Sequence, residues 1–99
     1  MFWDSKSRIE KIKSLMLSNL GLKEFDDVDD FKIAELTSIK QLSLSKNKIV
    51  HLQPLSFLKT LVTLNINNNK VYNIAPLESL TNLEELYASN NEISVIVPL

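Results

Sequence analysis

The chain has 99 residues, enough for one domain with a modest hydrophobic core and too few for multidomain catalytic machinery. Apolar residues make up 44% and charged residues 23%, a composition typical of a folded protein rather than a disordered one. Eleven basic and twelve acidic residues give a formal charge of −1, which provides no global field to attract nucleic acid or an anionic membrane. The sequence has no cysteine, which excludes disulfides, thiolate metal sites and a cysteine nucleophile.

Residues 1–11 are predicted to form a short helix that closes the N-terminal end of the fold. Asp4 or Ser5 can cap its first turn, and its apolar positions continue on one helical face at Ile9, Ile12 and Met16. The segment lacks the apolar stretch of a signal peptide, and no run approaches the ~20 residues that cross a bilayer. Without a targeting segment, cysteine or glycosylation sequon, we expect a soluble intracellular protein, cytoplasmic or nuclear.

Residues 12–38 are interpreted as an atypical first unit. Its apolar residues precede those of the following unit by 27 positions: Ile12, Leu15, Leu17, Leu22, Phe25, Val28 and Phe31. The slot that holds Asn47 in the next unit holds Leu20 here, and Gly21 follows it. The turn in the first unit should therefore differ from the turns in the later units.

An acidic stretch within this unit, Asp26–Asp30, invites interpretation as a metal site. It lacks the Asp-x-Asp-x-Asp-Gly loop with a glutamate at the twelfth position, so calcium binding is not supported. These carboxylates are instead predicted to cap and charge the first turn of a convex helix that runs toward Leu36. No metal ion is expected.

Residues 39–99 contain regular repeats of 22 residues, the last of them incomplete. Nine positions recur between the first two copies: Ile39, Leu42, Leu44, Asn47, Ile49, Leu52, Pro54, Leu55 and Leu58 become Leu61, Leu64, Ile66, Asn69, Val71, Ile74, Pro76, Leu77 and Leu80. A third copy holds Leu83, Leu86, Ala88, Asn91, Ile93, Ile96, Pro98 and Leu99. A helix of period 3.6 cannot produce this spacing, so the pattern indicates a repeat architecture.

The unit, L-x-x-L-x-L-x-x-N-x-I-x-x-L-x-P-L-x-x-L, resembles leucine-rich repeats of the 22-residue class over roughly residues 12–99. Within that class the chain is similar to the regulatory subunit of protein phosphatase 1 and to the leucine-rich-repeat light chain of axonemal dynein. The resemblance implies an α/β solenoid: a short right-handed coil with parallel strands on the concave side and 3₁₀ or short helices on the convex side. The open C-terminal end is expected to be covered by a partner or by further residues.

The residues alone favour the same arrangement. In Leu42-Ser43-Leu44 and its repeats the period is two, so the outer residues point into the coil and the middle residue points out. Strands are predicted around Met16, Ser43, Asn65 and Tyr87, which should form an exposed column. The asparagine slot lies where the chain leaves the strand, and its amides should bond backbone groups of adjacent turns as a structural ladder: Asn47, Asn69 and Asn91.

The candidate binding surface is the concave face. Its exposed slots run from basic in the first units to neutral and then acidic, with Tyr87 as the one aromatic anchor. This order suggests a binding surface, although chance remains an open alternative with only four units. The predicted partner-binding residues are Met16, Lys40, Ser43, Lys46, Asn65, Asn67, Glu84, Glu85 and Tyr87.

Nothing in the sequence points to catalysis or to a cofactor. His51 is the only histidine, and a catalytic base needs an oriented partner and a nucleophile that the pattern does not supply. The only glycine is Gly21, so there is no phosphate-binding loop. We therefore expect no enzyme activity and no cofactor.

The leading prediction is a non-catalytic module that binds an intracellular protein. By resemblance the partner is a phosphatase catalytic subunit, a dynein or other cytoskeletal component, or part of a large assembly. The alternative is a role in a ribonucleoprotein complex through a protein partner, because a spliceosomal protein shares the repeat type. Dispersed basic residues and few aromatics argue against direct nucleic-acid binding. Bacterial host-binding proteins also carry 22-residue repeats, but that role requires export.

Overall fold

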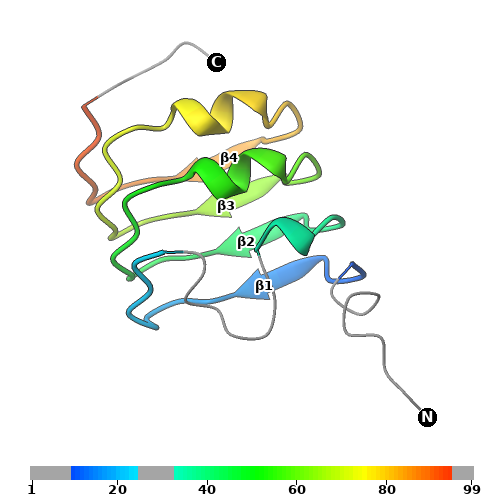
Figure 1. Cartoon of the computed structure of the whole chain (residues 1–99), viewed down its shortest axis with the longest axis horizontal. Helices are drawn as coiled ribbons and strands as arrows, with labels where there is room; N and C mark the ends of the chain where they lie inside the picture. Colours follow the sequence, from blue (N-terminus) through cyan, green and yellow to red (C-terminus); the bar gives the residue numbers. More distant parts are fainter. Residues whose placement is uncertain (1–9, 25–32, 95–99) are drawn as a thin grey trace.

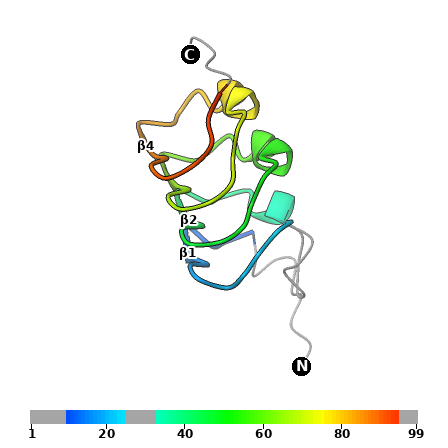
Figure 2. The same cartoon turned by 90° about the vertical axis from the view of Figure 1, so that its left-hand side faces the viewer.

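The computed structural model describes residues 10–24 and 33–94 of the chain. Within these ranges, four short strands form one parallel sheet in the order β1-β2-β3-β4: β1 is Ser14–Met16, β2 is Gln41–Ser43, β3 is Thr63–Asn65 and β4 is Glu85–Tyr87. Three short 3₁₀ helices alternate with the strands: η2 is Ile33–Glu35, η3 is Gln53–Phe57 and η4 is Ala75–Ser79. The strands lie on one side and the helices on the other (Figures 1 and 2), so the predicted solenoid architecture is confirmed.

The predicted register is confirmed. Met16 pairs with Ser43, Ser43 with Asn65, and Asn65 with Tyr87. Each strand is centred one residue earlier than predicted. For example, β2 is centred on Leu42 rather than Ser43, because its regular pairing ends at Ser43, the residue predicted to point outward. Hydrogen bonds between adjacent turns continue past that point, as when the Leu44 N–H donates to the Asn65 carbonyl at 2.7 Å.

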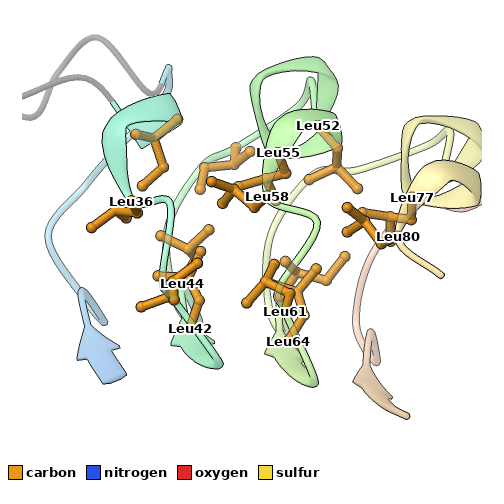
Figure 3. Close-up of a cluster of buried hydrophobic side chains, with 14 of the residues drawn as sticks. Leu36, Leu42, Leu44, Leu52, Leu55, Leu58, Leu61, Leu64, Leu77 and Leu80 are labelled. Atoms are coloured by element: carbon orange, nitrogen blue, oxygen red, sulfur yellow. The ribbon is translucent and has the colours of Figure 1, made fainter. Parts of the chain in front are cut away.

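The core lies between the sheet and the helices. Leu42, Leu44, Leu64 and Ile66 are buried and point inward from the strands, as the period of two predicts. Leucines from the convex side of each turn meet them (Figure 3): Leu52, Leu55, Leu58, Leu77 and Leu80. Toward the two ends of the sheet the equivalent side chains are only partly buried: Leu15, Leu17, Leu86 and Ala88. Each turn therefore depends on its neighbours for burial.

Proline helps to place the helices on the convex side. Pro54 is the second residue of η3, where its fixed φ suits the turn and its missing N–H costs no hydrogen bond. The Leu55 and Leu58 amides then donate to carbonyls three residues earlier, at 2.9 and 3.0 Å, which is 3₁₀ geometry. Pro76 has the same place in η4. The predicted short convex helices are confirmed there.

Two predicted helices fall largely on residues that the structure does not describe. Of the helix predicted to run from Asp26 toward Leu36, η2 is the described part, and residues 25–32 lie outside the described ranges. Of the N-terminal helix predicted for residues 1–11, only Glu10 and Lys11 are described, and they form a turn.

The asparagine ladder lies where the sequence places it. The Asn69 amide group donates to the Leu44 carbonyl of the preceding turn at 2.9 Å and to the Ile66 carbonyl of its own turn at 3.0 Å. Its carbonyl oxygen accepts from the Ile49 N–H at 3.0 Å. Asn47 and Asn91 make the corresponding bonds to the preceding turn and to a carbonyl of their own turn. The ladder joins consecutive turns through backbone groups at the point where each strand ends.

One position in each turn adopts the left-handed backbone conformation. The φ angles are positive at Asn19, Lys46, Asn68 and Asn90, which occupy the same slot in successive units. Asparagine tolerates this region, whereas a lysine there carries a steric cost. Of these four residues, Lys46 is the one whose side chain disfavours the left-handed conformation that its backbone adopts.

We predict that Asn69→Ala lowers the free energy of unfolding by about 1–3 kcal/mol more than Asn67→Ala does. Asn69 is buried and its loss leaves buried backbone groups unsatisfied, whereas Asn67 is half-exposed and accepts hydrogen bonds from Ser89 that water can replace. Urea denaturation of both variants measures the difference. Equal unfolding midpoints would show that the ladder does not stabilise the fold as described.

We predict that Lys46→Asn raises the free energy of unfolding by up to about 1 kcal/mol, because asparagine relieves the cost of a positive φ. Lys70→Asn is the matched control, since Lys70 is exposed and does not have a positive φ. Thermal denaturation should show a higher midpoint for Lys46→Asn and little change for the control. A rise of the same size in both variants would assign the effect to the lost charge instead.

Candidate functional site

The concave face comprises the outward residues of four equivalent segments, 13–19, 40–46, 62–68 and 84–90. Parallel pairing in register stacks equivalent residues beside one another. The sequence-predicted site residues therefore form columns that cross the sheet.

An acidic and aromatic group lies at β4. The Tyr87 ring is 46% exposed, and its hydroxyl donates to Glu85 Oε2 at 2.9 Å. The other oxygen of Glu85 accepts from the Thr63 hydroxyl at 3.2 Å. Both carboxylate oxygens are thus held by hydroxyl donors, and the exposed ring is fixed at one edge. This arrangement lowers the side-chain entropy that a partner would otherwise have to restrict on binding.

Glu85 also alters the acid-base behaviour of Tyr87. The hydrogen bond from the tyrosine hydroxyl to the Glu85 carboxylate raises the pKa of Tyr87 above its ordinary value, and the negative charge of Glu85 raises this pKa further. The neutral phenol is therefore favoured in the folded chain. This bond is intact below the ordinary tyrosine pKa and is lost as the pH rises through the raised pKa of the folded state.

The middle of the face is polar and uncharged. The Asn65 side-chain oxygen accepts from the Asn67 N–H at 2.9 Å. The Asn67 oxygen accepts from the Ser89 N–H at 2.7 Å and from the Ser89 hydroxyl at 2.9 Å. These bonds orient the two amides.

The expected exposure is not found at Ser43. Met16 in the same column is 74% exposed, but Ser43 is only 7% exposed. Its hydroxyl lies 3.2 Å from that of Ser18 and 3.5 Å from that of Ser45. The short Ser43 side chain lies against these two hydroxyl groups and is buried, so the prediction of a fully exposed column is wrong at this position.

Charge is distributed along the face as the sequence suggests. Lys13 and Lys40 lie side by side where β1 and β2 begin, Val62 is the equivalent residue before β3, and Glu84 precedes β4. Lys46 is exposed beyond the end of β2. Within residues 10–24 and 33–94, no lysine or glutamate of this face has an opposite charge within 4.0 Å.

Two features outside this face were missed at the sequence level. Phe57 of η3 is 69% exposed beside a shallow hollow lined by residues of η3 and η4, among them Pro76 and Glu78. His51 Nδ1 lies 3.9 Å from Glu24 Oε1, and the His51 ring meets Tyr72 edge-on with centroids 6.4 Å apart. Because Glu24 lies 27 positions before His51, the repeat offset could have indicated that contact.

The described residues contain no group of three histidine, cysteine, aspartate or glutamate side chains that could hold a metal ion. The acidic residues Asp26–Asp30 lie outside the described ranges. None of the helices in those ranges is long and apolar enough to cross a bilayer.

Comparison with known proteins agrees with the geometry. Residues 59–98 match the family model of leucine-rich repeats in two copies. The described residues fold as a leucine-rich-repeat solenoid. No curated protein matches it significantly.

Solved structures of Listeria monocytogenes internalins are similar to this solenoid. An internalin, inlF, is 31% identical with a TM-score of 0.79, and the match covers 92% of this chain and 25% of that one. Internalin C2, inlC2, is 28% identical with a TM-score of 0.66, and the match covers 92% of this chain and 49% of that one. The solenoid thus spans between a quarter and a half of the length of these two structures.

We predict that Glu85→Gln lowers the pKa of Tyr87 toward its ordinary value, because it removes the carboxylate that accepts the hydroxyl and supplies the negative charge. Spectrophotometric titration of tyrosinate measures this shift, with Tyr72→Phe as the background so that Tyr87 is the only tyrosine that titrates. Glu84→Gln is the matched control. An equal downward shift in the control would indicate a general field effect rather than the specific contact.

Proposed function

We propose that this solenoid is a non-catalytic protein-interaction module that binds its partner through the concave face. Leucine-rich-repeat domains generally mediate protein–protein interactions. The observation that carries the proposal is the Thr63–Glu85–Tyr87 chain of hydrogen bonds, which holds a half-exposed aromatic ring on a sheet face. Interface energy is commonly concentrated in such aromatic anchors.

The sheet supports rigid presentation of this face. Each strand pairs with its neighbour and each turn is bonded to the preceding turn through the asparagine ladder. Residues on the face are therefore held in register before any partner arrives, which reduces the entropic cost of binding. The predicted partner-binding residues stay as proposed, except that Ser43 contributes little exposed surface.

The identity of the partner is a proposal from sequence resemblance alone. The candidates are a phosphatase catalytic subunit, a dynein or other cytoskeletal component, and a member of a large assembly. The lack of cysteine supports an intracellular site of action, cytoplasmic or nuclear, in this proposal.

We predict that Tyr87→Ala weakens partner binding by at least about 2 kcal/mol, or about thirtyfold, because it removes a preorganised anchor. Glu78→Lys is the convex control, since Glu78 is exposed on η4 away from the strands. Proteins captured from cell extract by the wild-type chain are identified, purified and titrated against both variants, whose folding is verified by circular dichroism. Loss of binding with Glu78→Lys but not with Tyr87→Ala would place the working surface on the convex side.

A further inference from the structure

The charges of the concave face are separated into two blocks. Its three lysines all belong to the first two units, at Lys13, Lys40 and Lys46, and its two glutamates, Glu84 and Glu85, both belong to the last unit. The intervening β3 unit carries no charge on this face. Since none of these charges has an opposite charge within 4.0 Å among the described residues, both blocks are available to a ligand.

We infer that the concave face binds a short segment of a partner protein in which an acidic block and a basic block follow one another. The acidic block would lie over β1 and β2 and the basic block over β4. This inference rests on the proposed function, and it adds the chemistry and the orientation of the partner. Complementary charges set register and exclude partners with like charges opposite one another.

The spacing of the strands fixes the length over which the charge must reverse. Adjacent strands lie about 4.8 Å apart, so β1 and β4 are separated by about 14 Å. A helix covers that distance in about ten residues and an extended chain in about four or five. A segment whose charges alternate from residue to residue cannot match two separated blocks, whereas a segment with one reversal can.

The size of the face favours a short segment over a second copy of this chain. The face extends about 20 Å along the strands and about 20 Å across them, or about 400 Å². Stable protein pairs bury about 800 Å² on each partner. The face is thus too small to hold a stable dimer by itself, although its two blocks would match those of a rotated copy.

The cationic end of a bound segment has a defined place. Glu85 is held by Thr63 and Tyr87, Glu84 stands exposed beside it, and the Tyr87 ring is half-exposed. An arginine suits this set, since its planar guanidinium can pair with a carboxylate and stack on an aromatic ring.

Lys46 supplies independent support for the basic end. It occupies a positive-φ slot that the other three units fill with asparagine, so the fold itself would be better served by asparagine there. A role of the Lys46 charge in binding accounts for the presence of lysine at a position where it lowers local stability.

The test uses two fluorescent synthetic peptides of about ten residues. In the block peptide several glutamates precede several arginines, and the alternating peptide has the same composition. At low ionic strength we expect the block peptide to bind at least about fivefold more tightly, and we expect the difference to shrink as salt is added. Equal affinities for the two peptides would overturn the inference.

Charge exchange separates the order of charges from the identity of particular side chains. Exchanging one block alone, by Glu84→Lys with Glu85→Lys or by replacing Lys13, Lys40 and Lys46 with glutamate, should abolish the preference for the block peptide. Exchanging both blocks together should restore it, because the peptide can bind in the opposite direction. Failure of the double exchange to restore the preference in a folded chain would overturn the inference.

Three further measurements complete the test. Lys46→Asn should bind the block peptide about twofold more weakly while remaining at least as stable as the wild type. Sedimentation of the chain alone should show a monomer, and a dimer that dissociates on exchange of one block would instead assign the face to a second copy.

If Tyr87→Ala abolishes partner capture while the two peptides bind equally, the inference fails and the proposed function stands. If Tyr87→Ala leaves capture intact, the proposed function fails.

Discussion

The hydrogen bonds of the asparagine ladder are the constraint on which the rest of the fold depends. Each described strand pairs over only three residues, so the sheet alone supplies few bonds between turns. At the point where the chain leaves the sheet, the Asn69 side-chain nitrogen donates to three backbone carbonyls and its oxygen accepts from one backbone N–H group. An unpaired peptide group there would cost about as much as a lost hydrogen bond. Within the described ranges no buried side-chain polar atom lacks a partner.

Because the ladder fixes the register, a residue's neighbour on the concave face lies 27 positions along the chain between β1 and β2 and 22 positions along it in the later units. Thr63 reaches Glu85, and Asn67 reaches Ser89, over the separation of 22 positions. Side chains on this face can therefore vary without disturbing the leucines beneath them, since the two sets point to opposite sides of the same strand. The core specifies the fold, and the outward columns are free to specify a partner.

The features that follow the repeat could be predicted, and the features that depend on side-chain size could not. Register, ladder and 3₁₀ helices all follow from leucine, asparagine and proline at fixed spacing. The burial of Ser43 depends on its short side chain and on its contacts with Ser18 and Ser45, which a period does not encode. The exposure of Phe57 escaped prediction because it lies within η3, where the repeat leaves its slot undefined.

The ladder also explains why the first unit can do without its asparagine. Asn47, Asn69 and Asn91 each donate to a carbonyl of the turn before them, at Leu17, Leu44 and Ile66 respectively. In the first unit the equivalent slot holds Leu20, which has no side-chain amide. The Asn47 oxygen instead accepts from the N–H groups of both Leu20 and Leu22, across the positive-φ Gly21. The side chain of Asn47, in the second unit, thereby supplies hydrogen bonds to the backbone N–H groups of the irregular turn in the first unit. The regular repeat begins at that contact.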